Sequence, residues 1–160
     1  MEIVAYIAVL AIIIGAVSSL FLWTVKIQKK ARAIQEITDN ARVAMRAVSQ
    51  EVNEAEDIYL PTSIFDSDSG QLSLETGKHL DAGETSSFLD FYLCGDALCL
   101  KEEGKESTAL TSDKIKVNKL KFTKIITGGR KSVEIELNIG SKSDAQVNID
   151  LISTASLRNY

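Results

Sequence analysis

The sequence has one histidine, His79, and two cysteines among its 160 residues, so it has few of the imidazole and thiol groups that zinc sites and catalytic triads use. A structural zinc site needs about four ligands, and a serine nucleophile needs a base beside it. The two aspartates of residues 66–70 stand at the wrong positions for an EF-hand, which favours a polar turn there. We therefore expect a protein that is not an enzyme, with no catalytic residues, no cofactor and no metal.

Charge is missing from residues 3–25, although 25% of the whole chain is charged. As a helix this segment would be about 34 Å long, and the hydrocarbon core of a bilayer is roughly 30 Å thick. A secretory signal peptide would have a basic start and a shorter apolar core, whereas Glu2 precedes this one. The pattern predicts a membrane-spanning helix half over residues 1–25.

Helix-breaking residues are also missing after the span, because no glycine lies between Gly15 and Gly70 and the only proline is Pro61. Apolar residues recur at steps of three or four from residue 27 to residue 59, which is the period of one helix face. We expect one rod of roughly 80 Å from residue 3 to about residue 57, with an amphipathic half over residues 26–59. The predicted stripe comprises Ile27, Ala31, Ile34, Ile37, Ala41, Met45, Val48, Val52, Ala55 and Tyr59.

Strand-like runs replace the helical pattern after Pro61. In residues 132–139 apolar side chains alternate with Glu134, Glu136 and Asn138, which is typical of a half-buried strand. A turn is expected at residues 127–130. The apolar positions change from odd numbers, at Ile115 and Val117, to even numbers, at Leu120 and Phe122, and this change predicts a bulge near residues 118–119. The strands are expected at residues 71–75, 88–94, 98–101, 115–126, 132–139 and 147–153. The fold class is therefore α+β, with the helix stripe of residues 41–59 covering one face of an antiparallel sheet domain over residues 60–160.

The two cysteines, Cys94 and Cys99, are separated by four residues that begin with Gly95-Asp96, and such a segment suits a short hairpin. Their spacing does not fit a Cys-x-x-Cys redox motif. A cross-strand disulfide is the favoured interpretation, and two reduced thiols in a strand are the alternative. A disulfide implies an oxidising compartment and therefore an extracytoplasmic domain.

Residues 2–15, Glu-Ile-Val-Ala-Tyr-Ile-Ala-Val-Leu-Ala-Ile-Ile-Ile-Gly, are similar to the start of type IV pilins and type II secretion pseudopilins, in which a glutamate opens an apolar span. Residues 41–56, the Leu120-Lys-Phe122 strand and residues 154–160 are similar to the larger minor pilins and the J-type minor pseudopilins. The resemblance covers the whole chain in outline, and the start is its specific part. It implies a long helix, half in the membrane, joined to an antiparallel sheet.

The resemblance also implies a function, that of a structural subunit of a type IV pilus or a type II secretion-like filament. Glu2 is expected to pair with the N-terminal amine of a neighbouring subunit. The implied partners are other subunits, an inner-membrane assembly platform, and membrane lipid before assembly. The family's basic leader does not precede Glu2 in this sequence, so prepilin processing and N-methylation are implied by the resemblance alone.

Three small residues, Ala11, Gly15 and Ser19, lie four apart on one face of the predicted span. Small residues at this spacing let helices approach closely in lipid. We expect this face to take part in subunit assembly, although small residues are common in any such helix.

A basic run follows residue 113 and contains no acid. It could bind DNA or another anionic surface, but the net charge of −4 and the neighbouring Glu134 and Glu136 favour a balanced, solvated sheet face. The candidate residues are Lys114, Lys116, Lys119, Lys121, Lys124, Arg130 and Lys131.

A second group of cations, Lys26, Lys29, Lys30 and Arg32, follows the span directly. The positive-inside rule would place the C-terminal domain in the cytoplasm, in conflict with the disulfide interpretation. A basic leader would restore the usual pilin orientation, so we expect a single-pass protein with an extracytoplasmic domain, at the cell surface or in a periplasmic filament. The competing hypothesis is a membrane-tethered adhesin or DNA receptor that does not polymerise.

Overall fold

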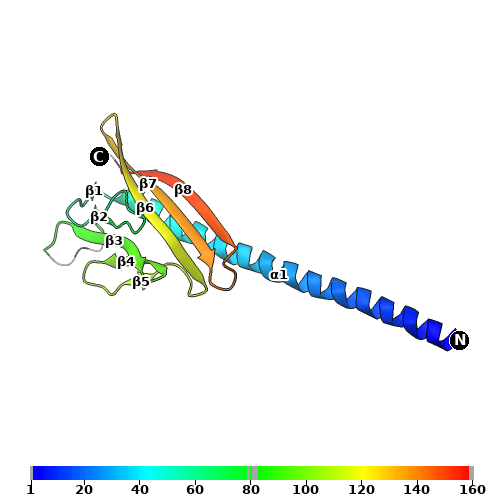
Figure 1. The fold of residues 1–160 in the computed structure, drawn as a ribbon. Coiled ribbons are helices and arrows are strands. Elements are labelled where there is room, and N and C mark those ends of the chain that lie inside the picture. The colour runs from blue at the N-terminus through cyan, green and yellow to red at the C-terminus, as the bar shows by residue number, and fades with distance from the viewer. Residues whose placement is uncertain (1, 79, 81–82, 159–160) are drawn as a thin grey trace.

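The computed structural model of the protein describes residues 2–78, 80 and 83–158. In this part of the chain one helix, α1 (Glu2–Glu54), projects from a body of eight strands (Figure 1). The strands are β1 (Asp57–Ile58), β2 (Leu72–Thr76), β3 (Ser87–Cys94), β4 (Ala97–Glu102), β5 (Thr108–Ala109), β6 (Ile115–Thr127), β7 (Arg130–Ser141) and β8 (Asn148–Ser156). The predicted α+β class is confirmed.

The helix α1 is unbroken over its 53 residues and is therefore about 80 Å long. It ends three residues earlier than expected, because Asp57 and Ile58 pair with Glu75 and Leu74 of β2 and so belong to the sheet. Tyr59, expected on the helix stripe, instead places its ring 4.7 Å from that of Phe88.

The last turn of α1 has no basic residue and contains Glu51 and Glu54. Negative charge is unfavourable there, because the C-terminal end of a helix carries the negative end of the helix dipole. Lys78, from the segment after β2, supplies the missing cation. Its ammonium lies 3.3 Å from Glu51 and forms a closer ion pair with Glu54. The hydrogen bond from Lys78 is the main reason why the pKa of Glu54 is lowered.

The strands form two antiparallel sheets, one in the order β1-β2-β3-β4-β5 and one in the order β6-β7-β8. All six expected strands are present, together with the two-residue strands β1 and β5, which were missed. Thr127 pairs with Arg130 across the expected turn, and the register shifts between Val117 and Lys119, which confirms the bulge.

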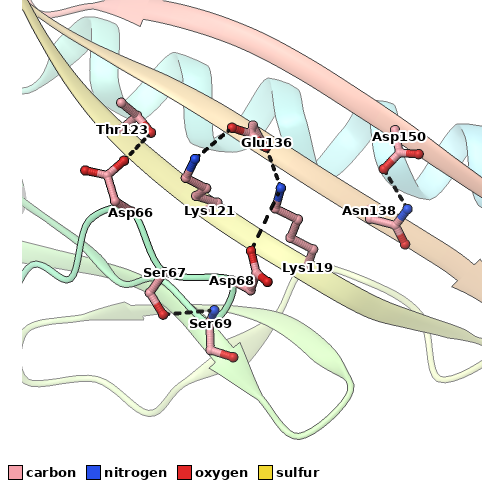
Figure 2. A network of polar contacts seen from close by, with 10 residues as sticks. All are labelled: Asp66, Ser67, Asp68, Ser69, Lys119, Lys121, Thr123, Glu136, Asn138 and Asp150. Atoms are coloured by element: carbon pink, nitrogen blue, oxygen red, sulfur yellow. Dashed lines mark hydrogen bonds and ion pairs between the residues drawn. The ribbon is translucent and has the colours of Figure 1, made fainter.

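The two sheets are joined by backbone hydrogen bonds from residues 64–71 to the outer edge of β6. The amide of Asp66 donates to the carbonyl of Phe122 at 2.9 Å, and the amide of Gly70 donates to the carbonyl of Leu120 at 2.8 Å. A Cβ at Gly70 would lie 3.1 Å from the carbonyl oxygens of Ile64 and Leu120, so this close approach favours glycine. The segment thus covers an edge of β6 that would otherwise be open (Figure 2).

The C-terminal part of α1 packs on β7 and β8 and completes the core. Ile37, Ala41, Ala44, Val48 and Val52 are at most 1% exposed. The buried stripe begins at Ile37, while the expected stripe members Ile27 and Ile34 remain 48% and 42% exposed. The domain therefore covers only the second half of the helix.

Candidate assembly surface

The first half of α1 is apolar on all sides and is not covered by the domain. Among the described residues it contains the one helix segment that is long and apolar enough to cross a membrane, and its most apolar window is 0% buried. Such exposure marks a surface that lipid or a partner covers, and the helix is consistent with a single-pass anchor. The large side chains that are at least 53% exposed are Ile3, Tyr6, Ile7, Val9, Leu10, Ile12, Ile13, Ile14, Val17, Leu20, Phe21, Leu22 and Trp23.

The small residues Ala11, Gly15 and Ser19 lie within this exposed half, as expected. A Cβ at Gly15 would meet nothing within 4 Å. The hydroxyl of Ser19 donates to the carbonyl of Ala16 at 2.8 Å, so its polar group is satisfied inside the helix. The backbone of Glu2 belongs to α1, but its side chain lies outside the described residues, so its pairing stays a prediction.

Two cations of the basic run share one carboxylate on the sheet face turned away from α1 (Figure 2). Lys119 and Lys121 lie 2.6 Å and 3.2 Å from the carboxylate oxygens of Glu136 on β7. Their hydrogen bonds, that of Lys119 first, lower the pKa of Glu136, and the pKa of Lys119 is raised in return. Lys119 also lies 3.9 Å from Asp68 in the segment that covers β6.

Three further cations of the run have partners in other elements. The ammonium groups lie 3.3 Å from Glu36 for Lys114, 3.7 Å from Asp96 for Lys116 and 2.6 Å from Asp57 for Lys131.

Lys124 and Arg130 form no ion pair within 4.0 Å in the described part of the chain. Because the other members of the run are matched to carboxylates, the run resembles a balanced polar face more than a surface for DNA.

The paired carboxylates make stability dependent on pH in the acid range. Hydrogen bonds from lysine lower the pKa values of Glu54, Asp57 and Glu136 below their ordinary values of 4.5, 3.8 and 4.5. A lowered folded-state pKa contributes stability that is present above the unfolded-state pKa and is lost as the pH falls through the folded-state value. We therefore expect the free energy of unfolding to decrease as the pH is lowered from about 4.5. Urea unfolding across pH should show a weaker acid dependence for Glu136→Gln, and an unchanged dependence would contradict the pairing.

Cys94 and Cys99 form a disulfide within the β3–β4 hairpin. Cys94 faces Ala97 and Cys99 faces Tyr92, so the bond runs diagonally across the hairpin. The turn contains only Gly95-Asp96, and Gly95 adopts a φ of 67°, which favours glycine. The bond thus closes the hairpin end that lies beside β6, where the amide of Val117 donates to the carbonyl of Asp96.

In the described residues, no group of three or more His, Cys, Asp or Glu side chains could hold a metal ion. His79 lies outside the described residues. The aspartates of residues 66–70 instead have structural contacts, since Asp66 accepts a hydrogen bond from Thr123 at 2.8 Å. Sequence reasoning missed these contacts because Asp66 and Thr123 are far apart in the chain.

The architecture is pilin-like, with one long N-terminal apolar helix packed on antiparallel sheets. Comparisons of the chain with protein-family models, curated proteins and solved structures found no match.

Proposed function

We propose that the chain is a structural subunit, of the minor pilin or pseudopilin kind, of a type IV pilus or type II secretion-like filament. The observation that supports this function is the continuity of α1. One unbroken helix joins an exposed apolar half to a half that packs on the sheet of β6, β7 and β8.

A helix of this kind can exchange one apolar environment for another. Before assembly, lipid covers residues 3–25, whose length of about 34 Å matches the bilayer core. In a filament, the helices of neighbouring subunits cover the same surface, and the domains lie outside. The bare face of Ala11, Gly15 and Ser19 provides a place for close helix contact.

The partners under this proposal are other pilin or pseudopilin subunits and an inner-membrane assembly platform, with the sheet domain on the extracytoplasmic side. The Cys94–Cys99 disulfide supports that side, because such bonds persist in oxidising compartments. Glu2 lies at the start of the span, where a charged group surrounded by lipid needs a partner, and the N-terminal amine of a neighbouring subunit would supply one.

The substitution Gly15→Leu tests the proposal. Because the space around Gly15 is empty, leucine should leave the fold of the single chain intact, and it removes a residue that disfavours helix by about 1 kcal/mol. It should nevertheless block close contact with a neighbouring helix. We expect the amount of the chain in filaments sheared from the source cells to fall at least tenfold, with the membrane-bound amount unchanged.

Ala16→Leu is the matched control, because residue 16 is turned about 100° away from residue 15 on the same exposed helix. It should assemble normally. If wild-type chain stays monomeric in the membrane whenever filaments form, the proposal is wrong, and the tethered binding module becomes the better hypothesis.

A further inference from the structure

Four cations directly after the apolar half of α1 have no protein partner in the described residues. Lys26, Lys29, Lys30 and Arg32, here called the basic collar, are all exposed, and no carboxylate lies within 4.0 Å of them. Most cations of the basic run on β6 and β7 are paired, by contrast. The basic collar is therefore the strongest unmatched positive charge next to the span.

The height of the collar along the helix corresponds to the headgroup layer. If residues 3–25 cross the hydrocarbon core, Lys26 lies at its boundary. From Lys26 to Arg32 the helix rises about 9 Å, and each headgroup layer is roughly 5–8 Å thick. The collar side chains therefore reach the depth at which lipid phosphates lie.

The collar also forms one wall of a hollow beneath the domain. The loop between β7 and β8 lies beside α1 where the helix leaves the domain (Figure 1). Its Ser143 and Asp144 line a hollow of about 720 Å³ together with the four collar cations. Lys26 and Lys30 are one turn apart, and Lys30 lies two turns before the buried Ile37, so these lysines share the face on which the domain packs.

The acids near the hollow do not cancel the collar charge. Glu36 lies 3.3 Å from Lys114, which neutralises it. Asp144 accepts a hydrogen bond from the backbone amide of Gln146 at 3.0 Å and is the one remaining acid on the lining. The lining thus keeps an excess of positive charge, with the hydroxyl of Ser143 beside it.

We propose that this hollow binds the headgroup of an anionic phospholipid, whose phosphate pairs with the basic collar under the β7–β8 loop. The proposal rests on the membrane anchoring in the proposed function. It also explains how so many cations are accommodated on the extracytoplasmic side, which the positive-inside rule disfavours. The lipid would hold the subunit at a fixed height before assembly.

Trp23, the only tryptophan in the chain, is a natural reporter for this site. It is 63% exposed and precedes Lys26 by about 4.5 Å along the helix. The full chain would be placed in vesicles of phosphatidylcholine with a fixed minority of phosphatidylglycerol. In one set the phosphatidylglycerol carries brominated acyl chains, and in the other an equal number of phosphatidylcholine molecules do. Bromine quenches tryptophan fluorescence at short range, so the two sets compare the lipids next to the collar.

We expect brominated phosphatidylglycerol to quench Trp23 more strongly than brominated phosphatidylcholine does. The preference for phosphatidylglycerol at this position should be about fivefold or more, which is the effect of roughly one cation near an anionic surface. Lys26→Gln/Lys30→Gln should remove most of this preference. Lys101→Gln/Lys105→Gln, which has the same spacing but lies far from the span, with Lys101 on β4 and Lys105 in the loop before β5, should keep it. Equal quenching by both lipids, or a preference that survives Lys26→Gln/Lys30→Gln, would overturn the proposal.

Two further outcomes separate related ideas. If inorganic phosphate abolishes the preference while chloride at the same ionic strength does not, the site takes a soluble phosphate and the lipid proposal is wrong. If neither brominated lipid quenches Trp23, the span is not in the membrane, and the anchoring itself fails. Equal quenching by both lipids, by contrast, leaves the anchoring intact and contradicts only the headgroup site.

Discussion

Replacing both Ile13 and Val17 with lysine is expected to release the chain from the membrane while its sheet domain stays folded. Each lysine at the centre of a span is about 3 kcal/mol less favourable than the apolar residue it replaces, so the pair shifts insertion by about 6 kcal/mol. Both side chains are at least 53% exposed and contribute nothing to the core, which begins at Ile37. Carbonate-washed membranes should retain most of the wild-type chain and little of the variant.

The matched control adds two lysines to the docked half of the same helix. Val43 is 60% exposed and Gln50 is also exposed, so Val43→Lys/Gln50→Lys adds the same charge outside the span. This variant should remain in the membrane. Retention of Ile13→Lys/Val17→Lys in washed membranes, at the wild-type level, would contradict the assignment of residues 3–25 as a span.

Replacing Phe122 with alanine is expected to lower the free energy of unfolding of the domain by about 4 kcal/mol. The ring is 0% exposed, and it lies against Gly70, where an added Cβ would be 3.2 Å from its Cδ2 atom. The substitution therefore leaves a cavity where residues 64–71 join β6. A domain of this size is stable by only about 5–15 kcal/mol, so this loss is a large fraction.

Urea unfolding followed by near-ultraviolet circular dichroism, with the disulfide intact, would measure this loss. Ile126→Ala on the same strand is the control, because Ile126 is 61% exposed and should cost less than about 0.5 kcal/mol. Membrane retention should be unchanged in both variants. A loss for Phe122→Ala as small as that of the control would mean that the two sheets are not joined at this point.

The outline of the fold could be predicted from the sequence because its main elements have strong local patterns. The uncharged run of residues 3–25, the missing glycines and prolines, and the 3.6-residue stripe together define α1. The alternation along β7 and the parity slip around Asn118 identify strands and bulge, since side-chain direction in a strand has a period of two. Such patterns require no knowledge of distant partners.

The features that were missed depend on partners far away in the chain. β1 and β5 have two residues each, too few for any periodicity, and they exist because β2 and β4 offer a neighbouring edge. The end of α1 was misplaced for the same reason. The segment covering β6 binds through backbone amides and carbonyls, which leave no signature in side-chain order.

The candidate site was predicted unevenly. Spacing predicted the shared face of Ala11, Gly15 and Ser19, and it favoured the Cys94–Cys99 disulfide over two reduced thiols. Which lysines of the basic run would be neutralised could not be predicted in full, because Asp57, Asp68 and Asp96 approach from other elements. Pairing of Lys119 with Glu136 was foreseeable, since β6 and β7 form a hairpin.

The distance between Ile12 and Val43 tests the central claim, that α1 continues unbroken from the apolar half into the docked half. Both side chains are exposed, so cysteines at these positions can carry spin labels without disturbing the core. In bilayers, pulsed electron paramagnetic resonance should give one narrow distribution near 46 Å, which is 31 residues at about 1.5 Å each. A main distance below about 30 Å would mean that the helix folds back on itself, and the proposed anchor and assembly surface would both be wrong.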